Sequence, residues 1–465
     1  MLKSTLIPVL LLALASASAQ SPQPELAPHP LFGAPAVHDI WIEFKQADYW
    51  KQMTDNFVEN SDDIPYIEAS FWFNENYYEK VGVRFKGNSS YRGATTKKPF
   101  RIKLNEYTKG QKIGGIASLN LNNLWNDPSF VREKLYFDLA ARAGLRAPRS
   151  NFANLYINGK FWGLYGLGEV VNADFLESRY VKADQTGSLY KGSAPGGTLD
   201  YLGDEQKPYA AFYEKKTNET DVTWTDLIAL TKMLKETPAA QRLAKVREML
   251  DVPSVLTSIA LDNLTVNLDS YVGMAQNYFI YRRPSDGKFE WITWDPSLAF
   301  GAFAIGVQAN QINTLPLEWS TESQPAGVPG GPPVGGGGGM GGPAGNRNTR
   351  PLTTVLWAIP EIRAEYRAIY KKLIDQVLIP DRLLVDARYL QSIIRANVQS
   401  DLNKLSTLEA FDKSLTEDVA GGTPGQGGFP GGPPVGGGGL GGQMSPGIGP
   451  LVRARDDFAR KQLAQ

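Results

Sequence analysis

The sequence has no cysteine and only two histidines, His29 and His38, among its 465 residues. Without cysteine the chain can form no disulfide framework, perform no thiol catalysis and offer no cysteine ligand to zinc, so packing alone must hold the fold. The shortage of histidine argues against a histidine-based catalytic dyad or zinc site. Acid–base or metal chemistry must therefore use carboxylates, lysines, arginines or tyrosines.

An excess of charge of either sign is also missing. Lysine and arginine together number 48, and aspartate and glutamate also number 48, with no basic stripe along the chain. A nucleic-acid-binding protein normally carries such a basic footprint, so we expect no nucleic-acid partner. Beyond the first residues there is no apolar run long enough to cross a membrane, and we expect no integral membrane segment in the mature chain.

The start of the chain has the features of a signal peptide at 1–19. Lys3 precedes an apolar run at 6–15, and Ala17-Ser18-Ala19 offers a cleavage site after Ala19. An uncleaved anchor is the alternative, but the apolar run is short for a membrane span. We expect a monomer that is secreted or held in the cell envelope. The proline-rich residues 20–37 are expected to form an extended leader.

Residues 38–171 are predicted to form an N-terminal lobe, an antiparallel sheet with one main helix. Apolar and polar residues alternate in its expected strands, as in 99–105, where Phe100 and Ile102 share one face and Arg101 and Lys103 the other. Asp127 and Pro128 predict the start of the main helix, with Asp127 as its N-cap, and Gly144 its end. The expected strands are 38–44, 66–73, 80–86, 99–105, 117–123, 152–158 and 160–168.

Residues 172–465 are predicted to form a mostly helical C-terminal lobe. Two glycine- and proline-rich segments, 325–346 and 421–450, interrupt it and share the run Pro-Gly-Gly-Pro-Pro-Val-Gly-Gly-Gly-Gly. Such segments bury too little surface to offset their chain entropy, so they are expected to be loops. The expected helices are 223–236, 238–250, 253–266, several within 351–418, and 450–463.

Three polar residues lie around a predicted hairpin in 257–301. Strands at 278–282 and 288–294 flank a Pro-Ser-Asp-Gly turn, so Asn277 enters the first strand and Asp295 leaves the second. Asp269 lies shortly upstream. Carboxylate and amide oxygens are ligands that Mg²⁺ and Mn²⁺ prefer, although the same residues also commonly cap turns. Asp262, inside the preceding helix, is a competing carboxylate that we expect to make a structural contact.

The N-terminal lobe adds residues that suit phosphate binding. Gly87, Asn88, Ser89 and Ser90 form a loop before the strand that carries Lys103, and Glu133 lies on the main helix. This combination suits phosphoryl transfer, which asks a protein chiefly for positioning and charge neutralisation. The alternative is a plain hairpin loop, a solvated sheet face and a solvated glutamate. Residues 169–172 are the expected hinge between the lobes.

Several motifs in one order resemble the CotH kinase family of spore-coat protein H-like secreted atypical protein kinases. They cover most of 80–301 and include VGVRFKGNSS (81–90), KKPFRIKLN (97–105), DPSFVREKLYFDLAARAG (127–144), NLDSY (267–271) and WITWDPSLAFG (291–301). The resemblance implies an α+β, two-lobed atypical protein-kinase-like fold. It also implies transfer of the ATP γ-phosphate to serine or threonine of a protein substrate, with Mg²⁺ or Mn²⁺.

The resemblance implies a role for each site residue. Asp269 would be the catalytic-loop aspartate, and Asn277 and Asp295 would hold the metal. Lys103 would contact the ATP phosphates with Glu133 as its partner, although Lys86, Lys97 and Lys98 are close competitors. The nucleotide would lie under Gly87, Asn88, Ser89 and Ser90 and against a hinge of Glu169, Val170 and Val171. Unlike ordinary protein kinases, the chain has Asn267-Leu268-Asp269 in place of His-Arg-Asp.

Two other functions compete with an exported kinase. A non-catalytic cell-surface, adhesion or envelope protein could use the same scaffold for binding. A glycan hydrolase could use a pair of carboxylates, and it would need neither a lysine nor a metal. Nucleotide binding that depends on magnesium separates the kinase from both alternatives.

Overall fold

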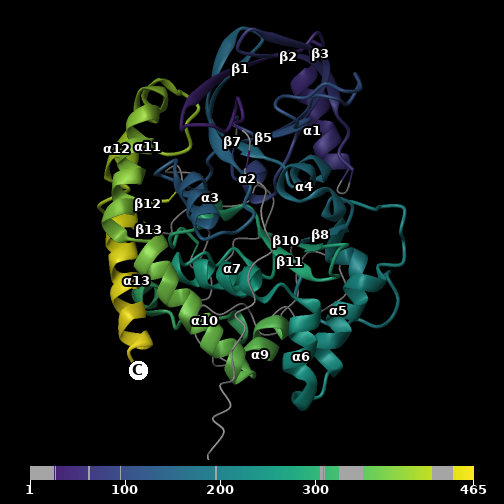
Figure 1. Ribbon diagram of the computed structural model, residues 1–465. Helices are drawn as coiled ribbons and strands as arrows, with labels where there is room; N and C mark the ends of the chain where they lie inside the picture. The colour runs from purple at the N-terminus through teal and green to yellow at the C-terminus, as the bar shows by residue number, and fades with distance from the viewer. Residues whose placement is uncertain are drawn as a thin grey trace, which may run out of the picture.

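A computed structural model of the protein describes residues 26, 28–60, 63–94, 96–193, 196–303, 307, 309–323, 349–421 and 444–465. The expected signal peptide at 1–19 and the glycine-rich segment 325–346 lie outside these residues. In Figure 1 the strands of the N-terminal region gather at the top, and most helices of the C-terminal part lie below them. The protein therefore has a sheet-rich N-terminal region and a largely helical C-terminal part.

The N-terminal strands form a closed barrel in the order β1-β2-β3-β4-β5-β7-β6. Each strand predicted for this region is present, but the sheet is not entirely antiparallel. β1 pairs with β6 in parallel, beginning with Val37 opposite Phe152, and this pairing closes the barrel. The strands are β1 Val37–Glu43, β2 Ile67–Phe73, β3 Asn76–Phe85, β4 Phe100–Lys103, β5 Ser118–Asn122, β6 Ser150–Ile157 and β7 Lys160–Glu169.

The barrel has an apolar interior and a polar outer face. Phe100 and Ile102 of β4 are fully buried, whereas Arg101 and Lys103 between and after them are only partly buried. This alternation confirms the two faces predicted for 99–105, because successive side chains of a strand point to opposite sides. The outer face of β3, β4 and β5 carries the polar side chains of the candidate site.

Part of the expected extended leader packs against the barrel. His29 and Leu31 are buried, and His29 Nε2 lies 3.1 Å from the carbonyl oxygen of Ile113. Asn151 Nδ2 donates to the carbonyl oxygen of Leu31 at 3.1 Å. These residues of the expected leader therefore pack against the barrel region. Burial lowers the pKa of His29 to about 4.

Three helices lie in the N-terminal region: α1 Tyr49–Glu59, α2 Ser89–Arg92 and α3 Arg132–Arg142. The main helix, α3, begins at Arg132 rather than at Pro128, and its N-cap is Val131 rather than Asp127. Asp127 still serves the helix start, because its carboxylate accepts the Arg132 backbone N–H at 3.0 Å and pairs with the Arg132 guanidinium at 2.6 Å. Gly144 follows the helix with a φ of 89°, as its position predicts.

The C-terminal part contains a second sheet in the order β11-β10-β8-β9. Its strands are β8 Ser188–Gly192, β9 Tyr213–Lys215, β10 Tyr278–Arg282 and β11 Phe289–Thr293. β10 and β11 pair in antiparallel fashion, which confirms the predicted hairpin. The longest apolar helix of this part, α7 Val252–Leu264, lies against β11.

The remaining elements confirm a mostly helical C-terminal part. Residues 444–450, expected to belong to a loop, instead form the short strand β13 Met444–Ser445 and the first turn of α13; residues 422–443 lie outside the described part. The helices are α4 Ala173–Arg179, α5 Thr225–Glu236, α6 Ala239–Met249, α8 Tyr271–Met274, α9 Pro351–Trp357, α10 Pro360–Lys372, α11 Pro380–Ser400, α12 Leu408–Lys413 and α13 Ile448–Leu463. β12 Val419–Ala420 pairs with β13.

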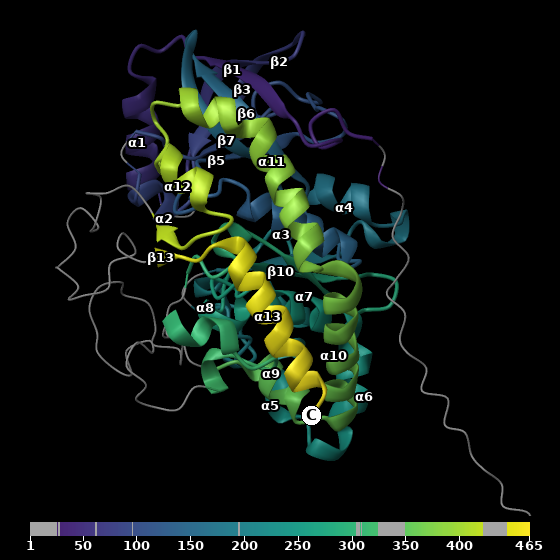
Figure 2. The ribbon, with the colours of Figure 1, turned by 90° about the vertical axis from the view of Figure 1, so that its left-hand side faces the viewer.

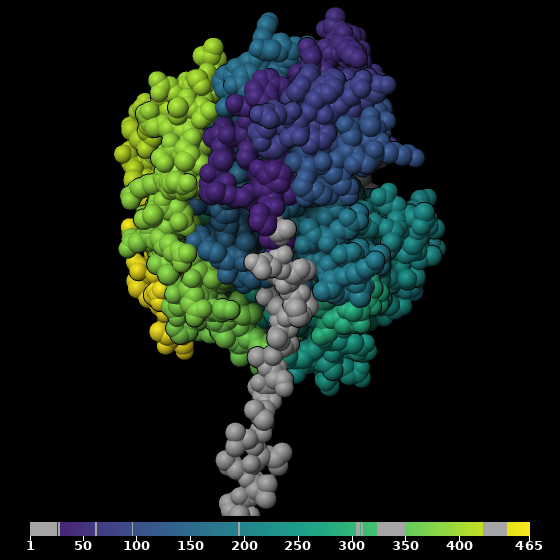
Figure 3. All heavy atoms as spheres, turned by 45° about the horizontal axis from the view of Figure 1, so that its top comes forward, coloured from purple at the N-terminus to yellow at the C-terminus, as the bar shows by residue number. Residues whose placement is uncertain are grey.

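The long helix α11 joins the C-terminal part to the barrel. Figure 2 shows α11 running alongside the barrel strands, and Figure 3 shows the C-terminal residues lying against the N-terminal ones along one side of the molecule. Just after α11, the Asp401 carboxylate receives Lys97 Nζ at 2.5 Å and the Leu164 backbone N–H at 3.0 Å. Both charged side chains are fully buried, so leaving either one unpaired would cost about 3–5 kcal/mol.

Among the described residues, every helix is too short or too polar to cross a membrane.

Candidate functional site

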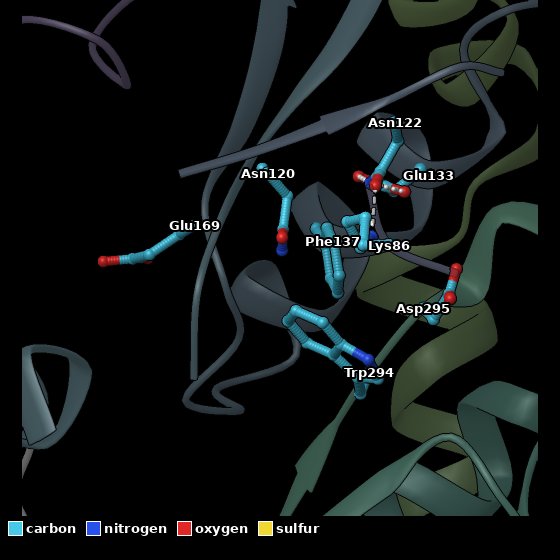
Figure 4. A pocket seen from close by; sticks show the side chains of 9 residues that line it. Lys86, Asn120, Asn122, Glu133, Phe137, Glu169, Trp294 and Asp295 are labelled. Carbon is cyan, nitrogen blue, oxygen red and sulfur yellow. Dashed lines mark hydrogen bonds between the residues drawn. The ribbon is translucent and has the colours of Figure 1, made fainter. Parts of the chain in front are cut away.

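A pocket with four ionisable residues lies where the barrel meets α3 and the end of β11. Lys86 follows β3, Glu133 lies in the first turn of α3, and Asp295 follows β11. Figure 4 shows these side chains gathered around Asn122 of β5. The pocket is lined by Lys86, Asn120, Asn122, Glu133, Phe137, Gly168, Glu169, Trp294 and Asp295.

Asn122 connects the lysine to the glutamate. Lys86 Nζ donates to Asn122 Oδ1 at 2.6 Å, and Asn122 Nδ2 lies 3.0 Å and 2.8 Å from the two carboxylate oxygens of Glu133. An asparagine amide can accept from a cation at its oxygen while it donates to a carboxylate at its nitrogen. The lysine and the glutamate are therefore held together by a bridging amide.

Burial shifts the pKa values of this group toward neutrality. Burial raises the pKa of Glu133 to about 7, and the negative charge of Asp295 acts in the same direction, while Lys86 opposes both. Burial lowers the pKa of Lys86 to about 8 against the opposing effect of Asp295. Buried groups whose charge partners shift their pKa values in this way are typical of functional sites, although structural ion pairs do the same.

The hairpin brings Asp269 and Asn277 into direct contact. Asn277 Nδ2 donates to Asp269 Oδ2 at 3.0 Å and to the Asp269 carbonyl oxygen at 2.8 Å, and Gln276 Nε2 donates to Asp269 Oδ1. Burial raises the pKa of Asp269 to about 7, and the charge of Asp295 raises it further. Asp295 thus acts electrostatically on Asp269, Glu133 and Lys86 at once.

Backbone conformation sets the two ends of the hairpin. Tyr278 at the start of β10 pairs with Thr293 at the end of β11, so Asn277 and Asp295 lie at the same end of the pair. Asn277 has a φ of 56° and Asp295 a φ of 48°. Asparagine and aspartate adopt this left-handed conformation more readily than other side-chain-bearing residues. The structure therefore gathers the three polar residues of 257–301 as the hairpin predicts.

The donor set around Asp295 is small. In the described part of the chain, His, Cys, Asp and Glu side chains nowhere form a group of three that could hold a metal ion. The carboxylate of Asp295 and the amide oxygen of Asn277 remain the ligands expected from the sequence. Mg²⁺ commonly takes one or two carboxylates from a protein and completes its shell with substrate phosphates and water. The residues therefore fit a hard divalent cation that arrives with a phosphate ligand.

The structure does not bring Lys103 to Glu133. Lys103 Nζ pairs with Glu106 at 2.6 Å, and the Lys103 side chain is 41% exposed. The strand register explains this: Lys103 pairs with Gly82, whereas Lys86 lies beyond the Phe85–Phe100 pair at the other end of β4. Three residues of strand separate the two ends by about 10 Å. The side chain expected to face the cleft therefore lies at the far end of its strand.

The other two lysines have partners of their own. Lys97 is paired with Asp401, and Lys98 Nζ donates to the carbonyl oxygens of Tyr91, at 2.7 Å, and Ala94. Among the lysines weighed from the sequence, Lys86 is the one that lines the pocket.

The loop residues Gly87, Asn88, Ser89 and Ser90 follow the pocket lysine directly. Gly87 has a φ of 82°, which favours glycine, and Ser89 and Ser90 open the short helix α2. Asn123, the residue after β5, donates from Nδ2 to the Ser90 carbonyl oxygen at 2.9 Å and so holds the end of the loop.

The expected hinge has mixed roles. Glu169 lines the pocket, but in Figure 4 its carboxylate points away from Lys86 and Glu133. That carboxylate pairs with Arg149 at 2.8 Å and with Arg179 at 2.6 Å, so only the rest of the residue faces the pocket. Val170 and Val171 are buried.

The sequence interpretation missed Asn120, Asn122, Phe137, Gly168 and Trp294. A signal for three of them was present. Asn120 and Asn122 alternate with buried leucines on β5, and Gly168 lies opposite Asn120 on β7. Polar or small residues on one face of an otherwise apolar strand indicate that this face lines a binding site rather than the core.

Asp262 makes the structural contact expected from the sequence. Its Oδ1 accepts the Tyr136 hydroxyl of α3 and Asn267 Nδ2 at 2.8 Å, and burial raises its pKa to about 7. Tyr136 lies one turn after Glu133, and Asn267 lies two residues before Asp269. Asp262 therefore joins the glutamate helix to the loop that carries Asp269.

We expect Asp262→Asn to change how stability depends on pH. The pKa of Asp262 rises from 3.8 to about 7 on folding, so folding favours its protonated form. The contribution of this protonation to the free energy of unfolding is fully present below pH 3.8 and is lost as pH rises through 7. Asparagine resembles the protonated acid and does not titrate. Denaturant unfolding at several pH values should show the wild type losing up to a few kcal/mol relative to Asp262→Asn between about pH 4 and pH 8. Parallel stability curves for the two proteins would contradict this expectation.

The barrel, the helical part and the pocket define an α+β protein with ionisable residues buried where its two parts meet. The sequence model of the CotH kinase proteins matches residues 83–418, which include every residue of the pocket. The chain therefore belongs to the CotH kinase protein family.

Its similarity to individual relatives is partial. The chain is 29% identical over 252 residues to inner spore coat protein H of Bacillus subtilis strain 168, covering 50% of this chain and 66% of that protein. It is 24% identical over 224 residues to invasin CotH3 and 24% identical over 196 residues to invasin CotH2, both of Rhizopus delemar. These matches cover 47% and 41% of this chain, but only 37% and 33% of the invasins.

Proposed function

We propose that the protein is an exported atypical protein kinase that transfers the ATP γ-phosphate to serine or threonine of a protein substrate, with Mg²⁺ or Mn²⁺. The observation that carries the proposal is the Lys86–Asn122–Glu133 relay, in which Lys86 and Glu133 are both hydrogen-bonded to the Asn122 amide. It lies beside Asp295 and the hydrogen-bonded pair of Asp269 and Asn277. A lysine held by a helix glutamate, next to two carboxylates and an amide, is the set that kinase chemistry requires. Membership of the CotH kinase family supports this reading.

The proposal gives Lys86 the role that the resemblance had suggested for Lys103. Lys86 would contact the ATP phosphates, and Glu133 would hold it in place through Asn122. Asp295 and Asn277 would hold the metal ion, which supplies charge neutralisation on the phosphate oxygens. The two parts of the molecule would correspond to the two lobes of a kinase-like fold.

Asp269 would act as the base. A serine or threonine hydroxyl oxygen attacks the γ-phosphorus, the bond to the β–γ bridging oxygen breaks, and ADP leaves. The hydroxyl proton passes to the Asp269 carboxylate. Burial and the charge of Asp295 raise the pKa of Asp269 to about 7, which suits proton transfer near neutral pH.

The remaining pocket residues would bind the rest of the nucleotide. Phe137 and Trp294 offer apolar surface for the nucleotide base, and Gly168 and Glu169 line the same pocket. The hinge residues Val170 and Val171 follow Glu169 directly. Gly87, Asn88, Ser89 and Ser90 would lie over the phosphates, because they continue the chain from Lys86.

Location outside the cell belongs to the same proposal. The features of residues 1–19 indicate export. The relatives are named as an inner spore coat protein and as invasins, which supports a coat or surface location for this chain as well.

The same names favour a second candidate function, a non-catalytic surface or adhesion protein. A binding protein would not need partly or fully buried ionisable groups whose pKa values are shifted by burial and by the charge of one aspartate, as those of Glu133, Lys86 and Asp269 are by Asp295. Those groups therefore favour the kinase.

Binding of ATP in the presence and absence of Mg²⁺ separates the candidates. We expect calorimetric titration of the purified protein to show ATP binding that requires Mg²⁺ or Mn²⁺ and is lost on chelation. An adhesion protein or a glycan hydrolase would bind no nucleotide, and that result would overturn the proposal.

A further inference from the structure

A second cation, Arg101, lies beside Lys86 on the outer face of the barrel. Arg101 of β4 pairs with Arg84 of β3 on one side and with Asn120 of β5 on the other. Its Nε donates to Asn120 Oδ1 at 2.7 Å. Asn120 lines the pocket, and Figure 4 shows its side chain extending from the strand toward Phe137 and Trp294.

Arg101 and Lys86 are held in the same way. Each donates to an asparagine oxygen of β5, Lys86 to Asn122 at 2.6 Å and Arg101 to Asn120 at 2.7 Å. The two asparagines are two residues apart, so they share one face of the strand. The strand therefore fixes two cations side by side: Lys86, which lines the pocket, and Arg101, whose partner Asn120 lines it.

The neighbouring strand carries a glycine opposite each of the two asparagines. Opposite Asn120 on β7 is Gly168, and opposite Asn122 is Gly166. A Cβ on Gly168 would lie 3.5 Å from Glu133 Oε1 and 3.6 Å from Asn122 Nδ2. The missing side chain thus leaves a space among the polar atoms of the pocket, where a ligand can approach the backbone closely.

The guanidinium of Arg101 has unused donors. Within the described residues, Nε is the one guanidinium nitrogen of Arg101 that donates a hydrogen bond. No carboxylate of the described residues forms an ion pair with Arg101. The carboxylate whose charge acts on Arg101, that of Glu214, is already paired with Lys191 and Lys216. Desolvation on partial burial lowers the pKa of Arg101 to about 10.

A partly buried guanidinium with free N–H groups suits a planar or tetrahedral anion, which it can bind through two parallel hydrogen bonds. The charge of Arg101 also lowers the pKa of Lys86, so both cations act on the same space.

We propose that Arg101 is a second phosphate-binding residue of this pocket and contacts the nucleotide phosphates together with Lys86. This inference rests on the proposed function and adds to it. It assigns to the outer face of the barrel the binding of phosphate by a second cation, which neither the loop at Gly87 nor the proposed metal-binding residues supply.

The test is the affinity of the full-length Arg101→Met protein for ATP, ADP and adenosine in the presence of Mg²⁺. We expect the affinity for ATP and ADP to fall about 10- to 100-fold, as for loss of a charged hydrogen bond, while that for adenosine stays within about twofold. Arg101→Lys keeps the charge but loses the fork, and should give an intermediate loss.

Arg84→Met is the matched control. Arg84 lies opposite Arg101 on the same face, but its guanidinium stacks over Tyr66 at 5.0 Å from the ring centroid. Its removal should leave all three affinities within about twofold. Melting curves of the variants show whether each is folded.

Three results would overturn the inference. One is an unchanged ATP affinity in Arg101→Met. If autophosphorylation at saturating ATP nevertheless slows in that variant, Arg101 binds an anionic group of the protein substrate instead of the nucleotide phosphates. Another is an equal loss of ATP and adenosine affinity, which indicates a structural role. The third is a wild-type protein that binds no nucleotide, which overturns the proposed function as well; the first two leave that function intact.

Discussion

The Asp269→Ala protein should bind Mg²⁺·ATP with nearly wild-type affinity and transfer phosphate about 10²- to 10⁴-fold more slowly. Asp269 contacts Asn277 and Gln276, and no residue of the Lys86–Asn122–Glu133 relay depends on it. Asn277 Nδ2 keeps its hydrogen bond to the Asp269 carbonyl oxygen at 2.8 Å, so removing the carboxylate removes the proposed base and leaves the proposed metal and phosphate contacts in place. Calorimetry measures the binding, and phosphotransfer at saturating ATP measures the chemical step.

Asp295→Ala should behave differently, because Asp295 is a proposed metal ligand. Its charge also acts on Lys86, Glu133 and Asp269, so its loss affects all three of these groups. We expect this protein to lose detectable Mg²⁺·ATP binding.

Asp286→Ala offers a matched control for both variants. Asp286 lies in the turn of the same hairpin, 39% exposed, and pairs with Arg283 at 2.7 Å. Its removal should change neither binding nor transfer. Phosphotransfer by Asp269→Ala at the wild-type rate would show that the base has been assigned wrongly.

Lys86→Met should have the second large effect. Methionine keeps the approximate length of the lysine stem but removes the cation, so the ATP phosphates lose a charge and Glu133 loses the group that it holds through Asn122. We expect phosphotransfer to fall about 10²- to 10³-fold, the loss associated with removing one electrostatic contact to the reacting group. The rate at saturating ATP measures this effect.

Lys103→Met is the complementary test of whether Lys86 or Lys103 contacts the phosphates. Lys103 pairs with Glu106 near the surface, and such an exposed pair contributes about 0–1 kcal/mol. We expect this variant to keep wild-type binding and transfer. Loss of activity in Lys103→Met with retention in Lys86→Met would restore the role that the resemblance had suggested for Lys103.

The strands of the barrel were predictable because their signal is local. Phe100 and Ile102 alternate with Arg101 and Lys103, and this pattern alone assigns the buried and polar faces. Closure of the barrel was not predictable. It depends on parallel pairing of β1 with β6, which joins Val37 to Phe152 across more than a hundred residues, and neither strand carries a sign of its partner.

The acidic half of the candidate site was also predictable, for the same reason. Asp269, Asn277 and Asp295 lie within one short stretch, and the hairpin turn fixes the register that brings Asn277 and Asp295 to one end. A turn of four residues with proline, aspartate and glycine is a strong local signal.

The lysine could not be chosen from the sequence. Lys86, Lys97, Lys98 and Lys103 all lie near the phosphate loop, and strand alternation assigns a face but not an end of the strand. The deciding contacts are long-range: Lys97 pairs with Asp401, and Lys86 reaches Asn122 of β5 across β4. Only the folded chain shows that one of the four lines the pocket.

The most direct test of the central claim is transfer of a radiolabelled γ-phosphate from ATP to the protein itself, with Mg²⁺ or Mn²⁺ present. We expect labelled serine or threonine in the wild-type protein, loss of the label on chelation, and its absence from Asp269→Ala and Asp295→Ala. The contrary result is a wild-type protein that its melting curve shows to be folded but that takes up no label and binds no ATP. That result would contradict the assignment of this pocket as a kinase site.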